Sequence, residues 1–292
     1  MYIIEPLDDN VHSITLKENK VPTFHCSDIH LDSAKCKRDL LKHDFDQIKD
    51  AGGLIFIYGD LLDIMGTYGD RRMRREGLDP QFIVKGRSYI DVVIDYTIEF
   101  LKPYAENIAF ISYGNHEQTI RDFHDTDPLR RIVYTLNQSP KVNIGLGAYA
   151  GWLIFKMKGR ARDLKLHYHH GFGGSAKRSK GVLNVQLEVM RYPDADLLVR
   201  GHTHQKWYDP STARQRITAA GTRFKDKVKY LQMGSYKDGL KDGHGGFEVK
   251  KNFAPTDIGG WNVYMEKVRI RKGEFDYEHI KTTVTEQTHD IF

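Results

Sequence analysis

Short apolar runs that end in glycine and metal-binding side chains are the feature that most constrains the fold of this chain. The clearest is the run Leu-Ile-Phe-Ile-Tyr at residues 54–58, which Gly59 and Asp60 follow directly. An apolar run of this length between glycines is typical of a buried strand. Ligands of open α/β sheets lie beyond the carboxyl ends of the strands. We therefore expect an α/β fold with Asp60 at that edge.

Four other apolar stretches end in similar side chains. They are followed by Asp28-Ile29-His30, Gly114-Asn115-His116-Glu117, His169-His170-Gly171 and Gly201-His202-Thr203-His204. Along an extended chain, residues two apart point the same way, so Asp28 and His30 are expected to reach one metal together. The same spacing places His202 and His204 on one side. Imidazole and carboxylate ligands together suit divalent metals.

The remaining pattern predicts alternating strands and helices in one domain spanning residues 1–292. Strands are expected at 2–5, 11–16, 21–27, 54–58, 108–112, 142–144, 152–157, 164–168, 196–200, 214–219, 228–233, 261–270 and 275–280, and helices at 35–51, 82–104, 127–137 and 182–190. The strands in residues 1–20 start a sheet or cover an edge, and residues 261–281 form a terminal hairpin. The strands at 142–144 and 152–157 are expected in a second sheet.

Composition bears on the size of the core, on membrane segments and on the cellular location of the protein. The chain has 292 residues, 40% of them hydrophobic, which is enough to bury a sizeable core. Because no apolar run approaches the roughly 20 residues of a membrane span, we expect no membrane segment. The start does not resemble a signal peptide, and Cys26 and Cys36 lack a disulfide framework. These features predict a reducing, cytoplasmic location.

The five motifs, in this order, resemble those of the calcineurin-like metallophosphoesterase superfamily, over roughly Thr23 to Tyr236. That superfamily includes Ser/Thr phosphatases, cyclic-nucleotide phosphodiesterases and Mre11/SbcD-like nucleases. The resemblance implies a four-layer α-β-β-α sandwich, in which helices flank two mixed β-sheets and the metal site lies at the carboxyl ends of the strands. It also implies two divalent metal ions, with Mn²⁺ as the first expectation and Fe, Zn²⁺, Mg²⁺ or Ni²⁺ as alternatives.

The resemblance also assigns the ligands. The first metal would take Asp28, His30, Asp60 and His204, and the second would take Asp60, Asn115, His202 and either His169 or His170. His169 is slightly favoured, because members with His-His-Pro at this point use the first histidine. Members with His-Gly use the histidine before glycine, which keeps His170 open.

Three side chains are expected to act in catalysis. Asp60 would bridge the two metals, His116 would donate a hydrogen bond or proton to the leaving oxygen, and Glu117 would orient His116. Asp63 is expected to support the loop rather than bind metal. Asp32 is interpreted as an ordinary carboxylate at a helix N-terminus.

The implied reaction is hydrolysis of a phosphate ester by a water or hydroxide that bridges the metals. Two basic loops are candidates for contacting phosphates, through Arg71, Arg72, Arg74, Lys177 and Arg178, although solvated surface is an equal alternative. These loops favour a phosphodiesterase or nuclease acting on DNA, RNA or a nucleotide. The alternatives are a phosphomonoesterase, such as a protein or small-molecule phosphatase, and a non-catalytic scaffold.

Overall fold

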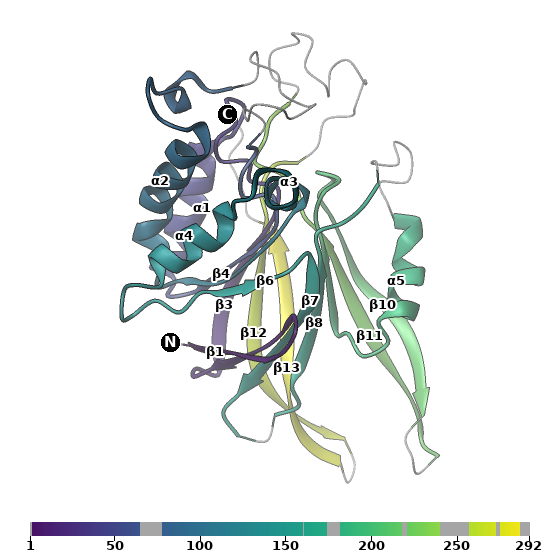
Figure 1. Cartoon of the computed structure of the whole chain (residues 1–292). Coiled ribbons are helices and arrows are strands. Elements are labelled where there is room, and N and C mark those ends of the chain that lie inside the picture. The colour runs from purple at the N-terminus through teal and green to yellow at the C-terminus, as the bar shows by residue number, and fades with distance from the viewer. Residues whose placement is uncertain are drawn as a thin grey trace.

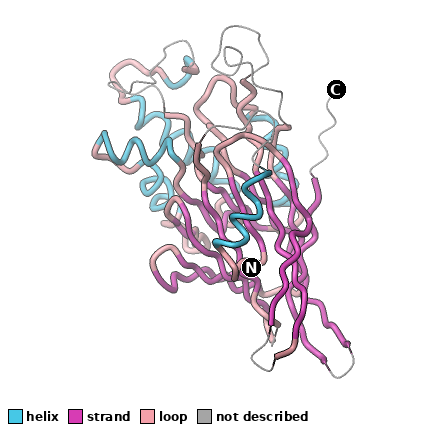
Figure 2. Tube along the Cα trace, turned by 90° about the vertical axis from the view of Figure 1, so that its right-hand side faces the viewer, coloured by secondary structure: helices cyan, strands magenta, loops and turns pink. Residues whose placement is uncertain are grey.

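Two β-sheets packed face to face form the centre of the computed structural model, which describes residues 2–64, 78–159, 161–173, 182–217, 221–239, 257–272 and 275–286. Helices α1 (Arg38–Asp50), α2 (Tyr89–Leu101) and α4 (Pro128–Leu136) cover the outer face of one sheet, as Figure 1 shows. Helix α5 (Val185–Arg191) covers the outer face of the other, and lies in front of the strands in Figure 2. The expected four-layer α-β-β-α sandwich is therefore confirmed.

The six-stranded sheet carries three of the candidate ligand stretches. Its strand order is β13-β12-β3-β4-β5-β6. The strands are β3 (Lys20–Cys26), β4 (Leu54–Tyr58), β5 (Ile108–Ser112), β6 (Gly145–Gly147), β12 (Trp261–Lys272) and β13 (Phe275–Glu286). Strands β3 to β6 run parallel, whereas β12 is antiparallel to both of its neighbours. Because β3, β4 and β5 are parallel, their carboxyl ends meet at one edge of the sheet.

The seven-stranded sheet brings the remaining ligand stretches to the same edge. Its order is β1-β2-β7-β8-β9-β11-β10. The strands are β1 (Tyr2–Asp8), β2 (Val11–Leu16), β7 (Ala150–Met157), β8 (Leu164–His169), β9 (Leu197–Arg200), β10 (Trp207–Ile217) and β11 (Arg223–Gln232). Strands β8, β9 and β11 are parallel neighbours, so the histidine motifs after β8 and β9 emerge side by side.

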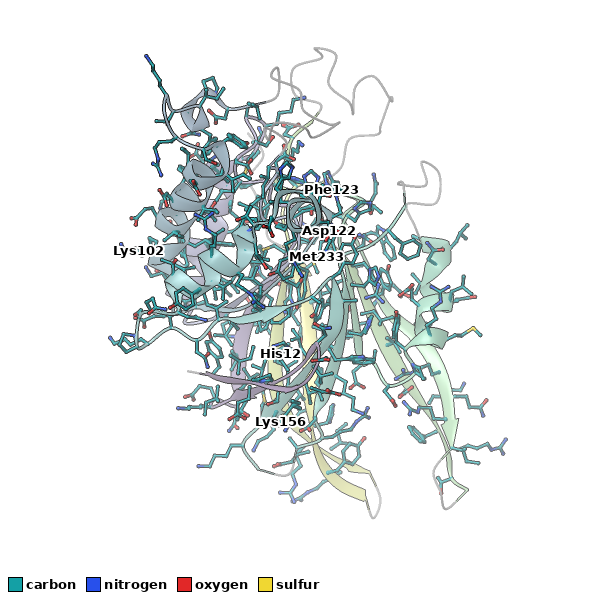
Figure 3. All side chains as sticks on the ribbon, in the orientation of Figure 1. His12, Lys102, Asp122, Phe123, Lys156 and Met233 are labelled. Atoms are coloured by element: carbon teal, nitrogen blue, oxygen red, sulfur yellow. The ribbon has the colours of Figure 1, made fainter. Side chains whose placement is uncertain are left out.

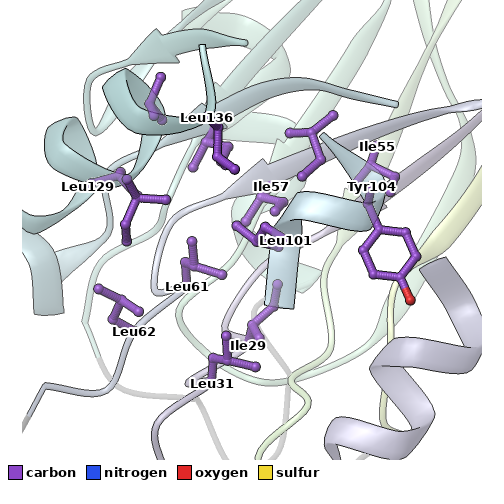
Figure 4. Close-up of a cluster of buried hydrophobic side chains, with 14 of the residues drawn as sticks. Ile29, Leu31, Ile55, Ile57, Leu61, Leu62, Leu101, Tyr104, Leu129 and Leu136 are labelled. Atoms are coloured by element: carbon purple, nitrogen blue, oxygen red, sulfur yellow. The ribbon is translucent and has the colours of Figure 1, made fainter. Parts of the chain in front are cut away.

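Strand β4 shows why its sequence is apolar throughout. Ile55 and Ile57 face the core beneath the helices, which Figure 4 shows. Phe56 and Tyr58 point the other way, into the core between the two sheets. A strand that is buried on both faces has no polar positions to alternate with, which accounts for the continuous apolar run.

Helix α3 (Asn115–His124) was not expected from the sequence. It begins inside the third ligand motif, directly after β5, and the side chain of Glu117, its third residue, accepts from the backbone N–H of the N-cap residue Gly114 at 3.0 Å. A glutamate three residues after an N-cap is a recognised start signal for a helix, so this helix could have been predicted. Helix α4 begins as expected: Asp127 accepts a hydrogen bond from the backbone of Arg130, and Pro128 occupies the first turn.

Several predicted elements differ in the structure, two of them substantially. The strand expected at residues 142–144 is wrong: β6 begins at Gly145 and joins the six-stranded sheet rather than the second one. The backbone N–H of Ile144 instead donates to the side chain of Asn137, 2.8 Å away, at the end of α4. The helix expected at 82–104 is shorter, with α2 between the short 3₁₀ helices η2 (Pro80–Phe82) and η3 (Lys102–Tyr104).

Among the described helices, none is long and apolar enough to span a membrane.

The core between the sheets gives a direct test of the sandwich. Replacing the fully buried Phe155 of β7 with alanine is expected to lower the free energy of unfolding by about 3–5 kcal/mol. The cost arises because the ring packs between the sheets, against Phe56. Urea unfolding monitored by circular dichroism measures this. Tyr134→Ala, at a side chain that is 69% exposed, is the control and should change stability by less than about 0.5 kcal/mol. Equal effects would contradict the packing.

Candidate metal centre

The loops after β3 and β4 run side by side beyond the strand ends. The backbone N–H of Asp28 donates to the carbonyl of Gly59 at 3.1 Å, and that of His30 donates to the carbonyl of Asp60 at 3.0 Å. The loop after β9 joins them, because both carboxylate oxygens of Asp28 accept from the backbone N–H of His202 at 3.1 and 2.9 Å. These main-chain contacts bring three of the five motifs together.

The backbone at the candidate ligands is not extended, which corrects the expectation drawn from residue spacing. Positive φ values occur at five of them: Asp28 (53°), His30 (50°), Asp60 (49°), His202 (69°) and His204 (55°). The left-handed region costs a non-glycine residue roughly 1 kcal/mol or more, and such residues cluster at functional sites. Because the chain turns sharply at each of these positions, His202 and His204 enter different ligand groups rather than one.

The first group joins β3 and β9 through Asp28, His30 and His204. The Nε2 atom of His204 lies 3.3 Å from Oδ1 of Asp28 and 3.3 Å from Nε2 of His30. Asp28 is fully buried, and its Oδ2 also accepts from the hydroxyl of Ser27 at 2.6 Å. This group contains three of the four residues that the resemblance assigns to the first metal.

The second group contains Asp60, His170 and His202, with Asn115 beside them. The Nε2 atom of His170 lies 3.2 Å from Oδ2 of Asp60 and 3.1 Å from Oδ1 of Asn115. The Nδ1 atom of His202 lies 2.7 Å from the same asparagine oxygen. Carboxylate, amide and imidazole atoms from four different loops therefore converge here.

Asp60 lies between the two groups. Besides its place beside His170, it forms a cluster with His30 and His116 in which one ligand atom from each residue lies within 4.8 Å of the others. The Nε2 atom of His116 is 3.8 Å from Oδ2 of Asp60. Asp60, which the resemblance predicts to bridge two metals, therefore lies next to one member of each group, His30 and His170.

The geometry favours His170 over His169 as a ligand, against the slight preference drawn from the sequence. His169 points elsewhere: its Nδ1 accepts from the backbone N–H of Gly171 at 2.9 Å, and its ring meets those of Tyr149 and Phe172 edge-on. In the described ranges, no cluster of candidate ligand atoms includes His169. The reason is alternation: β8 ends at His169, so adjacent side chains point to opposite sides.

A second contact on each ring determines which nitrogen faces the group. Nδ1 of His170 donates to the carbonyl of Tyr58 at 3.0 Å, and Nε2 of His202 donates to the carbonyl of Gly173 at 2.9 Å. Nδ1 of His30 lies 2.9 Å from Oδ1 of Asp63. Such outer contacts set the tautomer and ring orientation of metal-binding histidines. Each ring thus turns its other nitrogen towards the group.

Glu117 has a different role from the one expected. Its buried carboxylate accepts backbone N–H groups from Asp60 (3.1 Å), Leu62 (2.9 Å) and Gly114 (3.0 Å), and so joins the loops after β4 and β5. Instead, the carbonyl of Asp63 holds His116 by accepting from its Nδ1. Gly114 is required here, because a Cβ atom at this position would lie 2.1 Å from Oδ1 of Asp60.

Asp63 supports the site as expected, and its partner Lys237 was missed. The Lys237 ammonium lies 3.0 and 3.1 Å from the two oxygens of Asp63. No motif in the sequence singles out this lysine, which follows the Gly-Ser turn at residues 234–235.

Asp32 is not an ordinary helix-terminal carboxylate, which corrects that interpretation. It is buried and accepts the backbone N–H groups of Asp63 (2.6 Å) and Ile64 (2.9 Å) and the hydroxyl of Tyr89 (2.6 Å). Asp32 therefore holds the loop after β4, which carries Asp60 and Asp63. Its spacing from His30 is uninformative, because its partners come from distant segments.

The buried carboxylates of the centre favour positive charge beside them. Burial alone would lower the pKa of His170, but the charges of Asp60 and Asp28 raise it to about 10. Burial raises the pKa of Asp60, but the nearby histidines, His170 above all, hold this pKa well below its usual range. Burial and the charge of Asp60 raise the pKa of Glu117 to about 7.

These residues fit divalent cations. Asp60 belongs to the second group and also clusters with His30, a member of the first. Asp28, His30, Asp60 and His170 are buried, and His202 and His204 are partly exposed. Ligands of this kind, without thiolate, suit transition metals and Mg²⁺. A cation in the second cluster would take over the charge-balancing role of the proton on His170.

The predicted substrate contacts Arg71, Arg72, Arg74, Lys177 and Arg178 lie outside the described residues.

A family model described as calcineurin-like phosphoesterase matches residues 21–206 of the chain. This match spans more than half of the sequence and all five ligand motifs. The protein therefore belongs to the calcineurin-like phosphoesterase family. A search of curated proteins found no match.

A comparison with solved structures gave matches of low sequence identity. An uncharacterized protein of Streptococcus pneumoniae, described as a predicted phosphoesterase, is 12% identical with a TM-score of 0.33, and the match covers 90% of this chain and 99% of that one. GAP50 of Plasmodium is 14% identical with a TM-score of 0.38, covering 90% and 89%. A double mutant of Vps29 from Entamoeba histolytica is 16% identical with a TM-score of 0.25, covering 66% and 89%.

The choice between the adjacent histidines can be tested by titrating Mn²⁺ into metal-free protein in a calorimeter. His170→Gln is expected to weaken binding at the second group by at least about tenfold, because a ligand is lost. The matched control His169→Gln should bind like the wild type. Since the proton on His170 must leave, wild-type affinity should rise with pH from 7 towards 10, by up to about tenfold per pH unit. Equal losses in both variants would contradict the assignment.

Proposed function

We propose that this protein is a dinuclear-metal-dependent phosphoesterase that hydrolyses phosphate diesters of nucleic acids or nucleotides. The observation that carries the proposal is the position of Asp60, which clusters with His170 and His202 of the second group and with His30 of the first. Two divalent cations held there would clamp a phosphoryl group and activate water for attack. Membership of the family supports the reaction class. A non-catalytic scaffold would not need a complete set of oriented donors.

The proposed ligands are divided between two cations. Asp28, His30, Asp60 and His204 would hold the first, and Asp60, Asn115, His170 and His202 the second. We propose Mn²⁺ as the physiological ion, with Fe, Zn²⁺, Mg²⁺ and Ni²⁺ as alternatives. In the reaction, the water oxygen forms a bond to phosphorus, and the bond to the ester oxygen breaks.

His116 is proposed to protonate or hydrogen-bond the leaving oxygen. Its Nδ1 is committed to the carbonyl of Asp63, so its Nε2 faces the site, 3.8 Å from Asp60. The side chain is 12% exposed, which leaves it open to a substrate at the mouth of the centre. Glu117 is proposed to act through the backbone of Asp60 rather than through this ring.

A diester substrate is supported by the amino-acid sequence that follows two of the ligand motifs. The formal net charge is +5, and arginines and lysines cluster in the two loops that follow the second and fourth ligand motifs. Basic surroundings raise the local concentration of polyanions. The alternative within the same chemistry is a phosphomonoesterase.

We also propose a reducing compartment such as the cytoplasm, because Cys26 and Cys36 are both free and buried.

The substrate class can be tested with initial rates on bis-p-nitrophenyl phosphate and p-nitrophenyl phosphate, after chelation and re-addition of Mn²⁺. Faster turnover of the diester is expected. Asp60→Asn should reduce turnover by at least about 1,000-fold, because the shared ligand is lost. Preference for the monoester would favour the phosphatase alternative. No turnover with any of the proposed metals would contradict the enzyme.

The role of His116 predicts a different pattern from that of the ligands. His116→Ala should lower kcat by about 100- to 10,000-fold, the usual contribution of a general acid. Bound metal, measured by inductively coupled plasma mass spectrometry, should stay at the wild-type level. Loss of metal in proportion to activity would instead make His116 a ligand. His124→Ala, on the same helix, is the control and should match the wild type in both measurements.

A further inference from the structure

The inner faces of the two sheets change from apolar to cationic along their strands. In β11, Leu231 belongs to the core between the sheets. Alternate residues of a strand lie on the same face. The face of β11 that carries Leu231 therefore continues, away from the core, with Lys229, Lys227, Lys225 and Arg223. In β12, Val263 and Met265 belong to the same core, and Lys267, Arg269 and Arg271 continue their face.

These cations lie at the end of the sandwich opposite the metal centre. Gln232, the last residue of β11, pairs with Arg200, directly before the fifth ligand motif. Arg223 precedes it by nine residues, which is about 30 Å along a strand. Figures 1 and 2 show the β10–β11 and β12–β13 hairpins projecting beyond the other strands at this end. In Figure 3, Lys156 lies towards the hairpin end of the sandwich, whereas Asp122 and Phe123 mark α3, next to the candidate metal centre.

The two faces of the β10–β11 hairpin are neutralised differently. On the outer face, Arg214 and Arg216 both pair with the carboxylate of Asp226. On the inner face, the residues of β10 opposite the cations are Ala213, Gln215 and Ile217, none of which carries a charge. Among the described residues, no ion pair is recorded for Arg223, Lys225 or Lys227, and all three side chains are exposed.

The facing hairpin adds charge of the same sign. Arg269 and Arg271 are exposed, and Lys267 is partly buried. The carboxylate of Glu278 lies opposite Arg269 and 3.6 Å from Lys267, and Asp276 pairs in register with Arg271. These two acidic residues offset part, but not all, of this charge. Two surfaces of like charge repel each other, and burying lysine ammonium groups without partners is unfavourable. The inner faces therefore cannot close on each other here as they do in the core.

We infer that these two hairpin faces bind the phosphate backbone of a nucleic acid. Alternate residues of a strand are roughly 6.7 Å apart, so the cations form a regular row that suits regularly spaced phosphates. Neutralising phosphates with lysine and arginine releases counterions and drives binding without sequence preference. A row of this regularity favours nucleic acid over an acidic peptide, whose charges are irregular. The surface is separate from the metal centre, and its binding does not require hydrolysis there.

Fluorescence anisotropy tests this with the full chain in EDTA, using a fluorescein-labelled DNA single strand and the matching duplex over a range of salt concentrations. The combined variant Arg223→Gln/Lys225→Gln/Lys227→Gln should weaken binding at least about tenfold and reduce the slope of log affinity against log salt by about 2. Lys267→Gln/Arg269→Gln/Arg271→Gln, on the other hairpin, should also weaken binding.

The matched control removes three exposed charges from α1 and from the start of η3, as Lys42→Gln/Lys49→Gln/Lys102→Gln. It should leave affinity within about twofold, although its net charge falls equally. Wild-type binding that is absent at low salt, or reduced equally by the control, would overturn the inference. So would equal competition by polyglutamate at matched charge, which would identify an acidic protein as the partner. DNA binding without diester turnover would support this inference and contradict only the proposed activity.

Discussion

The hydrogen bonds of the Glu117 carboxylate to three backbone N–H groups are the contact on which the site depends. They connect the first turn of α3 to the loop that carries Asp60, so two loops from adjacent parallel strands keep one geometry. Gly114 makes the approach possible, because any side chain there would collide with Asp60. The hydrogen bond from the backbone N–H of Asp60 to Glu117 helps to hold the Asp60 carboxylate next to His170 of the second group and His30 of the first.

Charge balance explains the layers around that contact. Asp28, Asp60 and Asp63 are all buried. Burying a carboxylate charge without a partner costs free energy. Lys237 neutralises Asp63 from the Gly-Ser turn, while His170 lies against Asp60. The innermost carboxylates therefore face imidazole rings rather than a fixed cation such as lysine. This arrangement suits a centre in which metal ions supply the compensating charge.

The sandwich separates two kinds of surface. Parallel strands deliver polar loops to one edge, where main-chain contacts cross-link them into a metal centre. At the other end, the antiparallel hairpins β10–β11 and β12–β13 extend beyond the core, and their inner faces carry cations in place of apolar residues. The same two sheets thus provide the candidate metal centre and a surface suited to a polyanion. The long strands β11 and β12 connect the two ends.

The apolar runs and the motifs that follow them were enough to predict the strands buried on both faces and the residue types at their ends. Strands β4 and β5 were predicted with their observed bounds, because burial on both faces leaves an unbroken apolar run. The family resemblance then assigned most ligands by motif. Only the tertiary structure decided the orientation of those ligands. The left-handed backbone at Asp28 and His202, the choice of His170 and the backbone contacts of Glu117 all depend on neighbours from other strands. An argument from residue spacing is valid only for a regular backbone. These loops are not regular, and their conformation is set by contacts with neighbouring loops.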